Sequence, residues 1–177
     1  MIAREQIGNI ADSIRKPLGL TCPYDPEKAV SLLNGTIQPI SIDHKIDAAI
    51  KKNGEDSFII YLNTHEPYLR KRFTVAHELG HLFLHMGYLI DNEKWNSIPD
   101  DGFQDSAYFR MSDNYSQEEN EANEFAASFL MPKAEFIEFA KQHLSNNQYT
   151  IKPIAGYFKV SESAAINRGK WLGIFTW

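Results

Sequence analysis

Residues 77–81 read His-Glu-Leu-Gly-His, and this pentapeptide constrains the chain more than any other feature. Side chains four residues apart lie on one face of a helix, so His77 and His81 can bind one metal ion. Glu78 directly follows the first histidine, and its carboxylate can reach a water held at an open coordination position. Two imidazoles with a hard carboxylate ligand suit zinc, and the pattern is typical of zinc peptidases in which the glutamate is the general base.

A chance match of five residues is the alternative, because His and Glu also occur at this spacing on solvated helix faces. The motif is surrounded by apolar residues almost all round, which predicts a buried helix. Burying two histidines and a glutamate is costly unless a ligand binds them. We therefore favour a metal site, flanked by Val75, Ala76, Leu79, Leu82, Phe83 and Leu84.

The composition of the 177-residue chain predicts one globular domain, residues 1–177, with a substantial core. A net charge of -5 argues against broad nucleic-acid or membrane binding. The single cysteine, Cys22, excludes an internal disulfide and suits a reducing compartment. No apolar run reaches the length of a membrane span, and the first twenty residues have no signal-peptide core. These features predict a soluble, cytoplasmic protein.

The first third of the chain predicts two helices followed by strands. An amphipathic helix is expected over residues 2–18, and a shorter one after the Asp25 N-cap, with Gly35 as its C-terminal cap. Residues 36–42 alternate and are rich in β-branched side chains, which indicates a strand. The dipeptide at residues 53–54, Asn-Gly, predicts a tight hairpin turn.

The hairpin strands are expected at residues 47–51 and 57–62. The second of them is either a sheet edge that receives an extended peptide or an ordinary buried strand. A long helix that carries the histidine motif then begins near Pro67 and ends near Met86 and Gly87.

Residues 88–117 show little periodicity, and both a wall of a substrate cleft and a solvated insertion remain open for them. Further helices are expected over residues 116–131 and 132–144. Two short helices are expected in the tail, over residues 154–172.

A catalytic zinc site needs a third protein ligand. His85 is excluded from that role because three ligands on one straight helix span about 12 Å at 1.5 Å per residue. It is instead a candidate either to contact a ligand from behind or to pack in the core. The glutamates near the start of the helix at residues 116–131 are better candidates, although acidic residues also suit a helix N-terminus. Among them, Glu119 can point inward with Ala122, and Asn123 stacks one turn beyond, where it can orient or neighbour the ligand.

Two motifs together resemble the ImmA/IrrE family of metallopeptidases: Arg-Phe-Thr-Val-Ala-His-Glu-Leu-Gly-His at residues 72–81, and Glu-x-Glu-Ala-Asn-x-Phe-Ala-Ala-x-x-Leu-Met-Pro at residues 119–132. Residues 155–173 are similar to the end of that family's domain. The resemblance implies an α+β, zincin-like domain with a small sheet, an active-site helix and a helical C-terminal part. It also implies that His77, His81 and Glu119 bind zinc and that Glu78 is the catalytic acid/base.

The resemblance further implies a partner, because family members often act on phage-type helix-turn-helix repressors encoded beside them. The expected function is therefore selective cleavage of such a cytoplasmic repressor. A non-proteolytic regulator that uses the metal fold as a binding module is the alternative, as is the toxin of a toxin–antitoxin pair.

The tail, residues 150–177, also resembles a helix-turn-helix. On the second helix of this motif, only Arg168 and Lys170 supply positive charge, which is a thin footprint for DNA. The aromatic residues of the tail indicate packing, so a structural role is expected and nucleic-acid binding is not; they are Trp171, Phe175 and Trp177. The oxyanion donor is not readable from the sequence, and its candidates are Tyr108, Tyr115 and His85.

Overall fold

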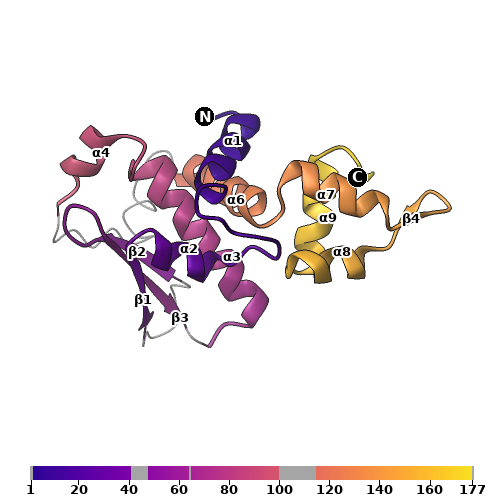
Figure 1. The fold of residues 1–177 in the computed structure, drawn as a ribbon, viewed down its shortest axis with the longest axis horizontal. Coiled ribbons are helices and arrows are strands. Elements are labelled where there is room, and N and C mark those ends of the chain that lie inside the picture. The colour runs from indigo at the N-terminus through magenta and orange to yellow at the C-terminus, as the bar shows by residue number, and fades with distance from the viewer. Residues whose placement is uncertain (1, 41–47, 64, 100–114, 177) are drawn as a thin grey trace.

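A computed structural model describes residues 2–40, 48–63, 65–99 and 115–176 of the chain. Within them the fold is α+β, with a three-stranded sheet at one end and a group of C-terminal helices at the other (Figure 1). No helix in these ranges is long and apolar enough to cross a membrane. The elements are α1 (Arg4–Arg15), α2 (Pro26–Leu32), β1 (Gly35–Ile40), β2 (Ala48–Lys52), β3 (Phe58–Asn63), α3 (Tyr68–Gly80), the π-helical turn η1 (His81–His85), α4 (Asn92–Ser97), α6 (Tyr115–Leu130), α7 (Lys133–Lys141), β4 (Leu144–Ser145), β5 (Gln148–Tyr149), α8 (Ile151–Phe158) and α9 (Glu162–Trp171).

The main sheet has the strand order β1-β3-β2. β1 runs parallel to β3, with Ile37 opposite Ile60, and β2 runs antiparallel to it, with Ile50 opposite Ile60. The expected hairpin is confirmed, and Gly54 in its turn has the positive φ of +84° that favours glycine. Because β3 is the central strand, it is not an edge that receives a peptide.

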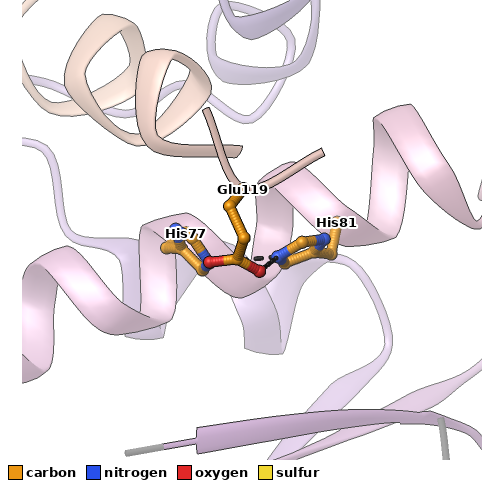
Figure 2. A group of neighbouring side chains, drawn as sticks. All are labelled: His77, His81 and Glu119. Atoms are coloured by element: carbon orange, nitrogen blue, oxygen red, sulfur yellow. Dashed lines mark hydrogen bonds and ion pairs between the residues drawn. The ribbon is translucent and has the colours of Figure 1, made fainter. Parts of the chain in front are cut away.

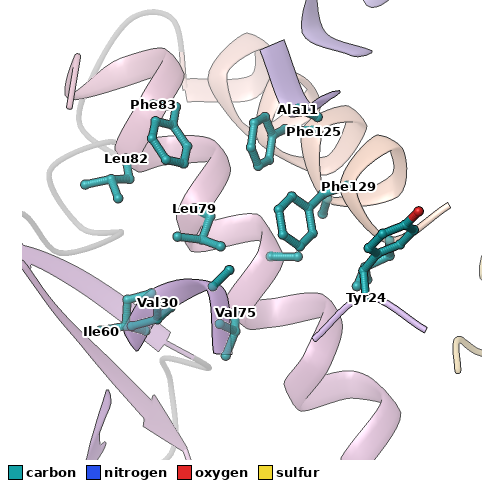
Figure 3. Close-up of a cluster of buried hydrophobic side chains, with 14 of the residues drawn as sticks. Ala11, Tyr24, Val30, Ile60, Val75, Leu79, Leu82, Phe83, Phe125 and Phe129 are labelled. Atoms are coloured by element: carbon teal, nitrogen blue, oxygen red, sulfur yellow. The ribbon is translucent and has the colours of Figure 1, made fainter. Parts of the chain in front are cut away.

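Helix α3 packs between the sheet and α6, and this sandwich forms the core (Figure 3). Val75 and Leu79 lie one turn apart on α3, as the spacing of the apolar residues predicts. Phe125 and Phe129 of α6 stack with ring centroids 6.1 Å apart and are fully buried. Each buried phenylalanine removes about 150–250 Å² from water, and this burial stabilises the packing of α6 in the core.

Gly80 allows α3 and α6 to approach closely. A Cβ at this position would lie 2.9 Å from Cα of Ala122 and 3.1 Å from Cβ of Phe125, so the backbones would have to move apart. We expect Gly80→Ala to lower the free energy of unfolding by about 1–3 kcal/mol, as overpacking does. Chemical denaturation measures this change.

Gly156→Ala is the matched control, because this glycine is exposed on α8 and a Cβ there would meet nothing within 4 Å. It should leave the stability unchanged or raise it by up to about 1 kcal/mol. Equal stability changes in the two variants would contradict the close approach at Gly80.

The end of α2 differs from expectation. Asn34, with a φ of 60°, takes the left-handed conformation, whereas Gly35 begins β1 and is not the cap. Gly35 is required for a different reason: a Cβ there would collide with Phe58 and would lie 2.8 Å from the Val30 side chain.

The region expected to be irregular, residues 88–117, contains α4, which Asp91 caps by accepting a hydrogen bond from the Lys94 amide at 3.0 Å. Trp95 of this helix is buried, so the first part of the region 88–117 belongs to the core. Residues 100–114 lie outside the described residues, and the two alternatives for them remain as stated. The short β4–β5 pair is not expected from the sequence, because two-residue strands leave no periodicity to detect.

Buried arginines hold the C-terminal helices to the rest of the molecule. Arg72 of α3 donates to the carbonyls of Tyr24 and Lys159, at 2.6 and 3.1 Å. Arg168 of α9 donates to the Met131 carbonyl at 3.0 Å and to Glu124 at 2.8 Å. Arg168 is therefore not available to contact DNA.

Trp171 is expected from the sequence to pack inside the molecule, but it does not. It is 52% exposed, and the Arg4 guanidinium carbon lies 3.3 Å from its ring centroid. Phe175 does pack as expected, against Phe136 and Tyr149. Trp177 lies outside the described residues.

Candidate metal centre

Three predicted ligands converge where α3 meets α6. His77 lies on the last turn of α3, His81 begins η1, and Glu119 comes from the first turns of α6 (Figure 2). The two Nε2 atoms are 3.0 Å apart. The Glu119 carboxylate places Oε2 3.4 Å from His77 Nε2 and Oε1 3.1 Å from His81 Nε2.

This group of donor atoms has the size of a metal site. All three candidate ligands offer atoms that lie within 4.8 Å of one another. Ligand atoms bound to zinc at about 2.0–2.1 Å with tetrahedral angles are roughly 3.3 Å apart. The observed separations bracket that value, and three ligands leave the fourth position free for water or substrate.

The hydrogen bonds behind the histidines direct their lone pairs toward this centre. Nδ1 of His77 lies 3.0 Å from Oδ1 of Asn123, which only accepts, so Nδ1 carries the hydrogen. Nδ1 of His81 lies 2.9 Å from Nδ1 of His85. Asn123 and His85 thus contact the two histidines at Nδ1, the ring nitrogen that does not face Glu119. Two ring nitrogens and a carboxylate facing one point repel each other unless a cation or protons lie between them, and this donor set fits zinc.

The pKa values of the three ligand candidates shift in different directions. Burial opposes ionisation of His77, but hydrogen bonding to Glu119 and the charge of Glu78 outweigh it and raise its pKa. Burial acts to raise the pKa of Glu119, but hydrogen bonds from the two histidines outweigh it and hold that pKa far below its ordinary value. Burial, reinforced by the charge of His77, lowers the pKa of His81. Glu119 is therefore an anion at neutral pH and available as a ligand.

Glu78 is 6% exposed and lines a cleft of about 870 Å³ beside His77 and Glu119. The cleft runs between α3, α6 and α9. Its α9 wall is not predicted from the sequence, although Ser163, Asn167 and Trp171 are four residues apart and share one helix face. That spacing is the signal that could have identified them.

The oxyanion donor remains unassigned among its candidates. His85 does not face the cleft, because its Nδ1 contacts His81 and its Nε2 lies 3.2 Å from Glu121 Oε2. Burial, with the charge of His81, lowers the pKa of His85 to about 4, so the ring is neutral at neutral pH. Tyr108 and the side chain of Tyr115 lie outside the described part of the structure.

The comparison with protein families matches residues 41–170 to the peptidase M78 family, described as the IrrE N-terminal-like domain. The chain belongs to this family of metallopeptidases, which confirms the resemblance to ImmA/IrrE proteins and the α+β, zincin-like fold class.

A solved structure of a Mycobacterium tuberculosis transcriptional regulator is similar in fold, with a TM-score of 0.62 and 16% sequence identity. The similarity covers 93% of this chain and 46% of that one, so the chain spans about half the length of the solved protein. A search of curated proteins found no match.

Proposed function

We propose that the chain is a zinc-dependent endopeptidase that makes selective cuts in a cytoplasmic protein. The observation that carries this proposal is the convergence of His77, His81 and Glu119 on one point, where Glu78 lines the same cleft as His77 and Glu119. Membership of a metallopeptidase family supports the same conclusion.

Zinc bound by these three residues would supply a Lewis acid that polarises the scissile carbonyl and makes water a stronger acid. Glu78 would take a proton from the attacking water and deliver it to the leaving amine nitrogen as the peptide C–N bond breaks. Asn123 would hold the His77 ring in the orientation and tautomer that expose its Nε2 lone pair.

The cleft supports an extended peptide segment as substrate. Its volume lies in the upper part of the range of about 300–1,000 Å³ that is usual for ligand pockets. Amide and hydroxyl groups of Asn120, Ser163 and Asn167 can donate to and accept from peptide groups along the walls. The family resemblance adds the class of partner that we propose, a helix-turn-helix repressor encoded nearby, cut in a linker or a locally unfolded stretch.

Co-expression with the neighbouring repressor, using the wild type and the Glu78→Gln variant, tests this function. We expect one zinc-dependent pair of repressor fragments with the wild type and an intact repressor with the variant. An intact repressor that loses DNA binding with both forms would favour sequestration, as in a non-proteolytic regulator or a toxin–antitoxin pair. An intact repressor that still binds DNA would refute the proposed substrate.

Trp171 offers an exposed aromatic surface to the substrate on the α9 wall. If a substrate side chain packs on it, Trp171→Ala should raise KM about 5- to 30-fold, equivalent to about 1–2 kcal/mol, with little change in kcat or zinc content. Rates of repressor cleavage at varied substrate concentration measure this.

Tyr68→Ala is the control, because Tyr68 is 55% exposed on α3 but does not line the cleft. It should leave KM unchanged. A similar KM in both variants would show that α9 does not contribute to substrate binding.

A further inference from the structure

A line of buried hydrogen bonds leads from His81 away from the cleft to the start of α1. Beyond the His81–His85 contact at 2.9 Å, Nε2 of His85 lies 3.2 Å from Oε2 of Glu121. The other carboxylate oxygen of Glu121 accepts from the Ile2 amide at 2.7 Å and from Nε2 of Gln117 at 3.0 Å. The His81, His85 and Glu121 side chains are all less than a tenth exposed, so water competes little for these bonds.

Local geometry separates this line from the cleft. Glu119 and Glu121 are two residues apart on α6, and side chains at that spacing point to opposite sides of a helix. Glu119 therefore reaches the ligand cluster, whereas Glu121 faces α1 and η1. In η1 the Met86 amide donates to the His81 carbonyl at 2.9 Å, a π-helical bond that accompanies the close approach of the His81 and His85 rings, whose centroids are 5.0 Å apart.

The direction of every hydrogen bond in the line is set from its Glu121 end. A carboxylate only accepts, so the hydrogen between Glu121 and His85 belongs to His85 Nε2. A neutral imidazole has one N–H, so Nδ1 of His85 accepts, and the donor facing it is Nδ1–H of His81. The remaining nitrogen of His81, Nε2, then carries the lone pair that faces Glu119 and His77.

We propose that His85 and Glu121 are positioning residues that fix the tautomer and orientation of His81, with the Ile2 amide anchoring the far end of the line. This inference rests on the proposed metal site, since it concerns how His81 presents its lone pair. Through this line Ile2, two residues before α1, supports a ligand 79 positions away in the sequence. Removing such partners of a metal-bound histidine usually weakens metal affinity about 10- to 100-fold.

Glu121→Gln tests the direction of the line. Because the Ile2 amide and Gln117 both donate to one oxygen of Glu121, the Gln carbonyl should keep that place and its N–H should face His85. This orientation reverses the line and places the hydrogen on His81 Nε2. We expect zinc affinity, measured by competition with a chelator, to fall about 10- to 100-fold. Glu118→Gln removes the same charge from the same helix outside the line, and it should retain an affinity close to that of the wild type.

Two substitutions of His85 separate hydrogen bonding from packing. His85→Leu fills the space without an acceptor and should weaken zinc binding like Glu121→Gln. His85→Gln offers a carbonyl to His81 Nδ1–H and should restore most of the affinity. Equal zinc affinities for the wild type and the Glu121→Gln and His85→Leu variants would overturn the inference.

Imidazole ¹⁵N spectra of the metal-free proteins give a readout that does not depend on zinc or on activity. We expect the hydrogen on Nδ1 of His81 in the wild type and a shift toward the Nε2–H tautomer in Glu121→Gln. An unchanged His81 tautomer in that variant would contradict the positioning role even if zinc affinity fell. Failure of the wild type to bind zinc would instead refute the proposed function, while the tautomer comparison would still decide this inference.

Discussion

Glu78→Gln is expected to retain zinc and to lose hydrolysis by about 10²- to 10⁴-fold or more, the range for general acid–base groups. Gln has nearly the same shape as Glu but cannot take a proton from water at neutral pH. Glu78 is not among the clustered ligands His77, His81 and Glu119, so the change should not empty the metal site.

Mass spectrometry of a substrate digest, with the zinc content measured in parallel, checks both parts of this expectation. The Asn120→Ala variant is a useful comparison, because Asn120 lines the same cleft but has no proton-transfer role. Full activity in Glu78→Gln would contradict the assigned role of the base. Loss of zinc from Glu78→Gln would show that the residue supports the metal and not the proton transfer.

Glu119→Ala is expected to cause the largest loss of zinc of any substitution on α6. Its carboxylate is the anionic member of the ligand group, with oxygens 3.4 and 3.1 Å from the two histidine Nε2 atoms. Its removal leaves only the two histidines, so the loss should exceed the roughly 10- to 100-fold effect of residues behind the ligands.

The metal content of purified Glu118→Ala, Glu119→Ala and Glu121→Ala variants measures the ligand assignment directly. We expect the order of zinc loss to be Glu119 first, then Glu121, then Glu118. If Glu121→Ala alone empties the site, the assignment along α6 is wrong by two residues.

The part of the site that follows from local spacing could be predicted from the sequence. His77 and His81 share a helix face by virtue of their four-residue separation, and the apolar residues around them bury that helix. Glu119 could not be assigned as a ligand from spacing alone. The inward face of its helix reduced the number of candidate glutamates, and the family resemblance selected Glu119 among them. The structure brings it to the two histidines, a contact between residues about 40 positions apart that no local pattern contains.

The parts that could not be predicted depend on long-range packing. The α9 wall of the cleft is held in place because Arg72 of α3 donates to the Lys159 carbonyl at the end of α8, and Arg168 of α9 donates to the Met131 carbonyl. The contact between His85 and Glu121 joins residues 36 positions apart and accompanies a π-helical turn, which a regular helix period does not anticipate. At Gly35 the local pattern suggests a helix cap. The actual reason for this glycine is its close contact with Phe58, which lies on a strand distant in the sequence and so leaves no local signal.

X-ray absorption at the zinc edge, on the chain loaded with one equivalent of zinc, tests the central claim most directly. The proposed site predicts nitrogen and oxygen ligands at about 2.0–2.2 Å, with longer-range scattering from two imidazoles. It also predicts that this imidazole signal disappears in a His77→Ala/His81→Ala double variant. Sulfur ligation near ~2.3 Å, which only Cys22 or a methionine could supply, would contradict the account, as would ligation without histidine.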